Sequence, residues 1–161
     1  MNPHASSARS RAIQRSAPRA FIEDKTTVLV RFNEVDSLHI VWHGHYANYF
    51  EEGRRAFGRR LGIDYPTFIE QRVAVPVIRL ELNFFAPARL ADTLVVITRL
   101  LKSDSARLDF NYEIRRETGD TLLATGNTSQ VFTTLAGELI LNWPPFMLER
   151  IESWKTLWKL P

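Results

Sequence analysis

One long amphipathic helix constrains the fold more than any other feature of this sequence. From His43 to Leu61, apolar side chains recur at intervals of three and four residues, the spacing that lines one face of an α-helix. These positions are Tyr46, Tyr49, Phe50, Gly53, Ala56, Phe57 and Leu61. Gly62 follows at the point where a glycine commonly ends a helix. Because so broad an apolar face must be covered, we expect this helix to lie on a sheet.

Gly53 adds a more specific expectation. A glycine within a helix costs about 1 kcal/mol relative to alanine. Its missing side chain allows another segment to come close. We therefore expect a sheet or a partner helix to pass directly over Gly53.

Most of the remaining chain is typical of antiparallel strands. Strand-like runs are expected at residues 25–33, 74–85, 93–103, 107–117 and 121–135, with a short closing run at 139–141. Turns are indicated at Thr118-Gly119-Asp120 and Ala136-Gly137-Glu138. Two further helices are expected, one capped by Asp64 and reaching Gln71, and a terminal amphipathic one that begins near Pro144.

This order of elements predicts a single α+β domain over residues 21–161. A curved antiparallel sheet would wrap around the long central helix, with a further helix at the C-terminus. The open edge of such a sheet favours self-association, as a homodimer or as a homotetramer built from two dimers.

Charge separates the first twenty residues from the rest of the chain. Arg9, Arg11, Arg15 and Arg19 lie in this segment, and no acidic residue does. They account for the net charge of +3, because the other 17 basic residues are balanced by 18 acidic ones. We expect residues 1–20 to be a disordered extension, with a targeting peptide as the alternative. The nearly neutral remainder argues against binding to nucleic acid.

Two absences limit the available chemistry. The 161 residues include no cysteine, which excludes disulfides, a thiolate nucleophile and cysteine-based metal sites. No run of 18 apolar residues occurs, so no membrane span is expected. Together with the lack of a secretory signal, these features favour a cytoplasmic location.

Candidate catalytic residues are concentrated just before the long helix. Asp36, His39, His43 and His45 lie in the loop and first turn that lead into it. Backbone N–H groups at a helix start lack partners within the helix and carry partial positive charge. The start at His43 and Gly44 is therefore a candidate site for stabilising an oxyanion.

This combination suits the hydrolysis of a thioester. A thiol with a pKa of about 8.5 leaves as a thiolate without strong acid catalysis. The reaction then needs a polarised carbonyl and a carboxylate that attacks it or activates water. Asp36 and the helix start can supply both groups. Aspartate also commonly caps a turn, so this structural role of Asp36 stays open.

The same segment resembles the 4-hydroxybenzoyl-CoA thioesterase type of the hotdog superfamily. The matching residues are Asp36, Ile40, Val41, Trp42, His43 and Tyr46, followed by the helical run 49–54. Residues 84–92 are similar to the family's aromatic-Ala-Pro-Ala-x-Leu-x-Asp turn between strands. The resemblance covers residues 26–134 and departs from the family pattern at His39, where the family has a glycine.

The resemblance implies a hotdog fold and an acyl-CoA thioesterase that forms a free carboxylic acid and CoA. Coenzyme A would be part of the substrate, and no other cofactor is implied. Asp36 would be the nucleophile or general base, and the backbone N–H of His43 would polarise the thioester carbonyl. Trp42, Tyr46 and Phe57 are candidates for lining the acyl pocket, as are residues of a partner subunit.

Other charged residues offer alternatives. Glu51 or Glu52 is a second candidate for the catalytic acid, because another hotdog class places its carboxylate on the central helix. An ion pair with Arg54 or Arg55 is the structural alternative for both. Candidate contacts for the phosphates of CoA are Arg79, Arg89, Lys102 and Arg107.

A metal site is not expected. His39 and His43 are four residues apart, but His39 precedes the expected helix, and no second cluster completes a set of ligands. Two other functions remain open at this stage. One is a dehydratase or hydratase of the same fold that acts on acyl-CoA or acyl-carrier protein, and the other is a non-catalytic acyl-binding module.

Overall fold

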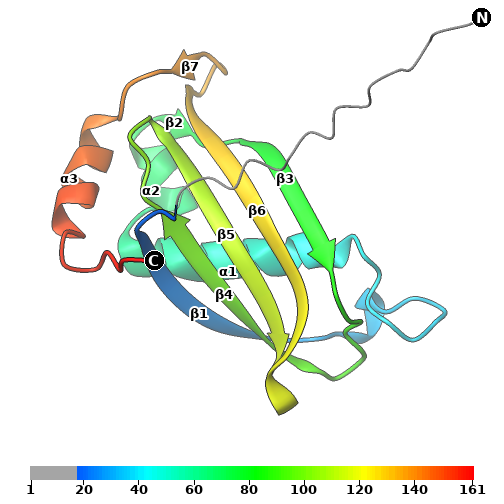
Figure 1. Cartoon of the computed structure of the whole chain (residues 1–161). Helices are drawn as coiled ribbons and strands as arrows, with labels where there is room; N and C mark the ends of the chain where they lie inside the picture. Colours follow the sequence, from blue (N-terminus) through cyan, green and yellow to red (C-terminus); the bar gives the residue numbers. More distant parts are fainter. Residues whose placement is uncertain (1–17) are drawn as a thin grey trace, which may run out of the picture.

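The computed structural model describes residues 18–161, which form one seven-stranded sheet and three α-helices (Figure 1). The strands are β1 (Phe21–Leu29), β2 (Val73–Ala74), β3 (Val77–Phe84), β4 (Thr93–Leu101), β5 (Arg107–Arg116), β6 (Thr121–Thr134) and β7 (Leu139–Ile140). The helices are α1 (His45–Leu61), α2 (Tyr65–Glu70) and α3 (Pro145–Ser153). The expected disorder of the N-terminal extension concerns residues that lie almost entirely outside this range.

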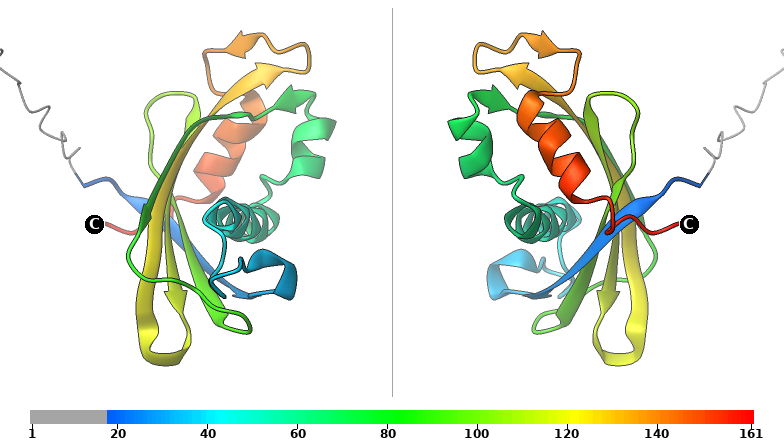
Figure 2. Two further views of the ribbon diagram at one scale, coloured as in Figure 1. Left: turned by 90° about the vertical axis from the view of Figure 1, so that its right-hand side faces the viewer. Right: turned by 90° about the vertical axis from the view of Figure 1, so that its left-hand side faces the viewer.

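The sheet is antiparallel throughout and follows the order β1-β4-β5-β6, with β2, β3 and β7 also paired to β6. Figure 2 shows α1 end-on against the concave face of this curved sheet, with α2 and α3 on the same side. This is the hotdog arrangement that the sequence predicts. None of the helices in residues 18–161 is long and apolar enough to cross a membrane.

The apolar face of α1 forms the centre of the core, as expected from its periodicity. Tyr49, Phe50 and Phe57 are almost fully buried, and the ring of Phe50 stacks on Tyr112 of β5 at 4.4 Å. Gly53 lies where the sheet comes closest. A Cβ atom there would stand 2.4 Å from Thr98 Oγ1 and 2.7 Å from Val96 Cγ1. The predicted close approach over Gly53 is confirmed.

Several expected boundaries are also confirmed. Gly62 ends α1 in a left-handed conformation, with φ of 70°. The Asp64 side chain caps α2 by accepting hydrogen bonds from the N–H and hydroxyl of Thr67. The turns at 118–120 and 136–138 lie where they were predicted, and both contain a glycine with positive φ.

Several boundaries differ from the sequence prediction, and three of the differences have a clear physical reason. The first strand is Phe21–Leu29, not 25–33, because Glu34 accepts a hydrogen bond from the Arg31 N–H and closes a short 3-10 turn there. The run at 74–85 is divided into β2 and β3 at Pro76, which has no N–H to donate to a sheet. The long helix begins at His45, not His43, because Gly44 is its N-cap.

Candidate functional site

Asp36 lies at the base of a tight loop that leads into α1. Val35 pairs with Val41, which brings the two ends of the loop together. Within the loop, the Asp36 N–H donates to Ile40 O at 2.9 Å, and the Asp36 carbonyl accepts from the His39 N–H at 2.9 Å. His39 adopts φ of 59°, the left-handed conformation that favours glycine. His39 therefore lies at a position whose backbone conformation suits the glycine of the family pattern.

The two carboxylate oxygens of Asp36 have different surroundings. Oδ1 accepts a hydrogen bond from the Leu38 N–H at 2.8 Å, so Asp36 does cap a turn. For Oδ2, residues 18–161 supply no hydrogen-bond donor or cation. The side chain is half-buried and lines a cleft with about 640 Å³ of empty space, part of which is open to solvent. One oxygen of the carboxylate is thus fixed while the other is available to a ligand.

The cleft is formed by two segments that lie far apart in the sequence. Its lining comes from the Asp36 loop, from the start of α1 and from the end of β3 with the turn after it. The lining residues are Asp36, Ile40, Val41, His43, Tyr46, Phe84, Phe85, Ala86 and Pro87. The two motifs that carry the family resemblance therefore meet at one site.

Tyr46 holds these two segments together. Its hydroxyl accepts a hydrogen bond from the Ala88 N–H at 3.0 Å, and its ring contacts the Phe84 ring edge-on at 5.1 Å. The Val41 N–H donates to the Ala88 carbonyl at 2.9 Å. Burial raises the pKa of Tyr46, so its hydroxyl stays protonated. The side chain is only 2% exposed, and its main role is to fix the shape of the cleft.

A second set of hydrogen bonds, away from Tyr46, fixes the turn at residues 84–92. Asp92 accepts hydrogen bonds from the Arg89 N–H and from Arg116 Nε, both at 2.9 Å. Arg116 also donates to the Pro87 carbonyl at 2.8 Å. These bonds fix the backbone of the aromatic-Ala-Pro-Ala turn, which explains why its sequence ends in an aspartate.

The start of α1 offers free backbone donors next to Asp36. The N–H groups of His45 and Tyr46 donate to the carbonyls of Trp42 and His43, at 2.9 and 3.3 Å. The N–H groups of His43 and Gly44 find no acceptor in the described part of the chain. The Trp42 indole lies over Gly44, where any Cβ would stand 1.9 Å from the ring. This packing explains the glycine at the N-cap.

The three histidines differ in position. The exposed His43 ring lines the cleft and lies 4.7 Å from the Trp42 ring, centroid to centroid. His45 shares a hydrogen bond with Asn48 at 3.2 Å, and His39 is exposed at the loop tip. No group of three or more potential metal ligands lies close together within residues 18–161.

The predicted pocket residues are only partly brought together. Tyr46 lines the cleft, and Trp42 is half-exposed at its margin over Gly44. Phe57 lies three turns further along α1. It is completely buried, and its ring packs against Phe110 at 5.5 Å. The expectation that Phe57 lines the pocket is therefore not met in this cleft, because its position on α1 faces the sheet.

The alternative acids on α1 are engaged in ion pairs, as the structural alternative predicted. Glu51 pairs with Arg54 and lies 3.4 Å from the Tyr65 hydroxyl, and Glu52 pairs with Arg55 at 2.5 Å. Neither glutamate lines the cleft of Asp36.

The four candidate cations do not form one cluster. Arg89 pairs through its backbone with Ile40, next to the cleft. Arg79 lies on β3 in an ion pair with Glu81. Lys102 lies in the β4–β5 connection and Arg107 is the first residue of β5, both at the end of the sheet opposite to the cleft. In a single subunit, Arg89 is thus the best placed of the four to meet a ligand at Asp36.

The sequence did not identify the wall of the cleft formed by Phe84, Phe85, Ala86 and Pro87. The aromatic-Ala-Pro-Ala turn motif is the available signal, but the sequence indicates only that it connects two strands. Its place beside Asp36 depends on the Tyr46–Ala88 hydrogen bond, which joins residues far apart in the chain.

Comparisons with known proteins identify the family of the chain. A family model described as the thioesterase-like superfamily matches residues 30–151. The chain is 26% identical over 125 residues to a Synechocystis protein provisionally named an esterase, covering 77% of this chain and 75% of that protein. It is 29% identical over 92 residues to the acyl-CoA thioesterase YbgC of Haemophilus influenzae, covering 56% of this chain and 68% of YbgC. A solved DHNA-CoA thioesterase from Staphylococcus aureus superimposes with a TM-score of 0.76 at 26% identity, covering 84% of this chain and 93% of that one.

Proposed function

The chain belongs to the thioesterase-like superfamily, and on that premise we propose that it hydrolyses acyl-CoA thioesters to a free carboxylic acid and CoA. The observation that carries this proposal is that the Asp36 carboxylate and His43 line one cleft, at a helix start where the N–H groups of His43 and Gly44 find no acceptor within residues 18–161. The acyl-CoA thioesterase and DHNA-CoA thioesterase among the similar proteins support the choice of a CoA thioester as substrate.

In the proposed reaction, the thioester carbonyl oxygen accepts hydrogen bonds from the N–H groups at the start of α1. Partial positive charge at that helix end stabilises the oxyanion that forms as the carbonyl carbon is attacked. The C–S bond then breaks, and CoA leaves as a thiolate that takes up a proton. The free Oδ2 of Asp36 supports the attack, because Leu38 already orients the other oxygen.

Asp36 has two routes to the same products. As a general base it takes a proton from water, whose oxygen adds directly to the carbonyl carbon. As a nucleophile it forms a mixed anhydride, which water then cleaves. After a single turnover in ¹⁸O-labelled water, label in the Asp36 carboxylate would indicate nucleophilic attack followed by addition of water to the aspartyl carbonyl. Trapping of the covalent acyl-enzyme would detect the anhydride whichever carbonyl water attacks, and general-base action gives neither result.

The decisive test is the release of free thiol from a panel of aliphatic and aromatic acyl-CoAs. Asp36→Asn should lower kcat by about 10²–10⁴-fold, the usual contribution of a catalytic base. Asparagine keeps an oxygen that accepts from the Leu38 N–H, so the loop should fold. Glu149→Gln, an exposed change on α3, serves as the matched control.

Three results would contradict the proposal in different ways. Undiminished hydrolysis in Asp36→Asn would remove Asp36 from the mechanism. Loss or addition of water without thiol release would indicate the hydratase alternative. Binding without turnover would indicate an acyl-binding module.

The free edge of β3 supports self-association, and we propose that a second copy of the chain pairs there. Within residues 18–161, β3 pairs with β6 alone, so its other edge is unpaired. Val77, Ile78, Leu80 and Phe84 are 42–62% exposed along this strand. An exposed apolar edge strand is a site for pairing with another chain. Light scattering of the wild-type protein should report the mass of a dimer. Leu80→Lys should weaken the dimer, whereas Leu148→Lys on α3 should not. Equal masses for the wild type and both variants would exclude the β3 edge as the interface.

A further inference from the structure

Glu34 is a buried carboxylate, two residues before Asp36, that the proposed reaction does not use. Two acidic side chains within residues 18–161 are buried, Glu34 and Asp109. Asp109 is paired with Arg19 and Arg107, at 2.9 and 3.0 Å. Glu34 forms no ion pair in the same part of the chain. Because burying a carboxylate without a cation is costly, the position of Glu34 points to a role that offsets this cost.

One oxygen of the Glu34 carboxylate joins two segments of the chain. Oε2 accepts a hydrogen bond from the Arg31 N–H and another from the Tyr49 hydroxyl, each at 2.8 Å. Tyr49 lies on α1, about one turn after its start, and is only 1% exposed. Burial and the hydrogen bond to Glu34 raise the pKa of Tyr49, so its hydroxyl stays protonated and donates. The Glu34 side chain therefore ties the segment before the Asp36 loop to α1.

The backbone of Glu34 extends this link to the Asp36 loop. Its carbonyl accepts a hydrogen bond from the Trp42 N–H at 2.9 Å, and the next pair, Val35 and Val41, closes the base of the loop. Glu34 is thus bonded to the returning arm of the loop through its backbone and to α1 through its side chain. A shift of the Asp36 backbone away from the helix start would strain or break these bonds.

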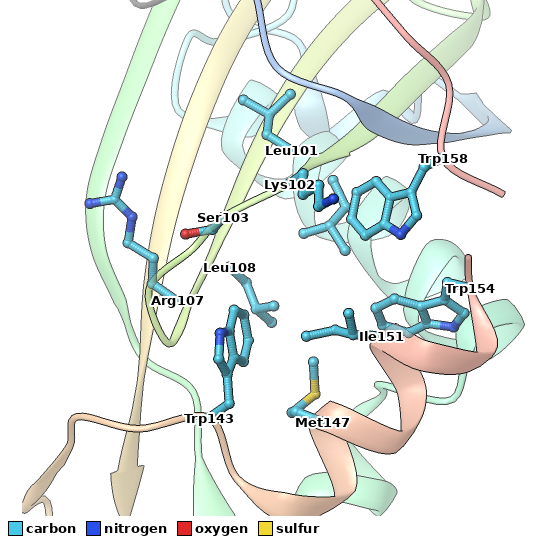
Figure 3. A pocket seen from close by; sticks show the side chains of 11 residues that line it. Leu101, Lys102, Ser103, Arg107, Leu108, Trp143, Met147, Ile151, Trp154 and Trp158 are labelled. Carbon is cyan, nitrogen blue, oxygen red and sulfur yellow. The ribbon is translucent and has the colours of Figure 1, made fainter. Parts of the chain in front are cut away.

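The opposite end of the domain is held together differently. Figure 3 shows Met147 of α3 and Trp154 directly after it facing the same space as Leu108 of β5. None of the residues that line this space is acidic. Apolar side chains of similar volume often stabilise a fold as well as buried charged groups do. Stability alone therefore does not require Glu34, whereas its hydrogen bonds fix both a direction and a distance.

We propose that Glu34 is a positioning residue that acts through Tyr49. It holds the Asp36 carboxylate at a fixed place relative to the N–H groups of His43 and Gly44 at the start of α1. A carbonyl bound by those N–H groups must meet the attack that Asp36 supports, so their separation affects the rate. Glu34 does not line the cleft and acts only through its neighbours. This inference rests on the proposed thioesterase activity.

Two buried tyrosines provide a matched pair of variants. Tyr49→Phe removes the hydroxyl that donates to Glu34, and Tyr112→Phe removes one that shares a hydrogen bond with Thr128 at 3.0 Å, away from the cleft. Both side chains are at most 1% exposed, so both changes should lower the urea midpoint of unfolding. Only Tyr49→Phe should lower kcat for thiol release from acyl-CoA, by about tenfold or more, with KM within about twofold of wild type.

Variants of Glu34 separate its hydrogen bonds from its bulk. Glu34→Gln keeps an oxygen that accepts from Tyr49, so kcat should stay within about fivefold of wild type. Glu34→Met has a similar length without that oxygen, and kcat should fall by about tenfold or more. Combining Glu34→Met with Tyr49→Phe should lower kcat no further than Glu34→Met alone, because both changes break the same link. Circular dichroism checks that each variant is folded at the assay temperature.

The possible results separate this inference from the proposed function. If Asp36→Asn loses hydrolysis while Tyr49→Phe and Tyr112→Phe have equal kcat values, Glu34 is not a positioning residue and the proposed function stands. The inference is also overturned if Glu34→Gln is as slow as Glu34→Met, or if the losses in the double variant multiply. A wild-type protein that releases no thiol from any acyl-CoA would overturn both.

Discussion

Two carboxylates near α1, Asp36 and Glu51, were both candidates for the catalytic acid, and their surroundings differ. Glu51 is paired with Arg54, whose guanidinium also donates to the Tyr65 hydroxyl at 2.9 Å and lies over the Tyr65 ring. Asp36 has no cation beside it in the described chain and makes one side-chain hydrogen bond, to a backbone N–H. Glu51 is neutralised by an ion pair, whereas Asp36 has no such pair within residues 18–161; in both groups one oxygen accepts no hydrogen bond from these residues.

This difference is the reason to propose Asp36, and not Glu51, as the catalytic carboxylate. An ion pair lowers the energy of the ground state and leaves fewer lone pairs for a substrate. A single backbone hydrogen bond orients the group and leaves its second oxygen available. Proximity to a helix is therefore less informative than whether the carboxylate is already neutralised by a cation.

Moving the Asp36 carboxylate should have the largest of the expected effects, a loss of kcat. Asp36→Glu keeps the charge but moves the carboxylate by one methylene and disturbs its bond to the Leu38 N–H. Misplacement by about 1 Å can cost about 10²-fold in rate, so we expect a loss of that order in kcat. Thiol release measured beside wild type checks this. A rate within threefold of wild type would show that the geometry around Oδ1 does not matter.

Removing the Tyr46 hydroxyl tests whether the shape of the cleft depends on the hydrogen bond that joins its two segments. Tyr46→Phe leaves the buried Ala88 N–H without an acceptor, which should cost about 1–2 kcal/mol in the free energy of unfolding. Urea unfolding measures this cost, and kcat should fall as the Phe84–Pro87 wall loosens. Tyr65→Phe, which removes an exposed hydroxyl, is the control. Equal stability of the two variants would show that the hydrogen bond between Tyr46 and Ala88 does not stabilise the fold.

The ion pair of Glu51 should show the opposite pattern, a change in stability with little change in rate. Glu51→Gln removes the charge facing Arg54, and we expect a loss of about 0.5–1 kcal/mol, because Glu51 is half-exposed. The rate of hydrolysis should stay within about threefold. A fall comparable to that of Asp36→Asn would move the catalytic role to Glu51.

His39 offers the smallest expected effect. Its φ of 59° suits glycine, so His39→Gly should change the free energy of unfolding by less than about 1 kcal/mol and leave activity nearly unchanged. His39→Val, a β-branched residue in the same conformation, should destabilise by about 1–2 kcal/mol. If glycine destabilises as much as valine, the histidine ring itself supports the loop.

The sequence predicted those features that depend on local pattern. The face of α1, the approach over Gly53 and the cap at Gly62 follow from spacing and from the properties of glycine, and all three are confirmed. Asp36 and His43 were placed at the start of α1, and the structure brings both into one cleft. Their catalytic roles stay predictions.

The sequence could not predict features that depend on pairing between distant segments. Phe57 has the same helical spacing as Tyr46, yet only Tyr46 reaches the cleft, because the sheet covers the rest of that face. The start of α1 lies two residues later than the sequence predicts, because its N-cap is Gly44, which has no side chain to mark a cap. The strand boundary at Leu29 depends on the Glu34–Arg31 hydrogen bond, which no apolar pattern reveals.

The hydrogen bond between Tyr46 and Ala88 also has a consequence for the order of folding. The helix that carries Tyr46 can form early from local contacts, but Ala88 reaches it only after β3 and β4 have found their places in the sheet. The cleft is therefore among the last parts of the domain to be assembled and among the first to open under mild denaturation. Enzymatic activity should disappear at lower urea concentrations than the helical circular dichroism signal, so recovery of activity is the stricter criterion for complete refolding.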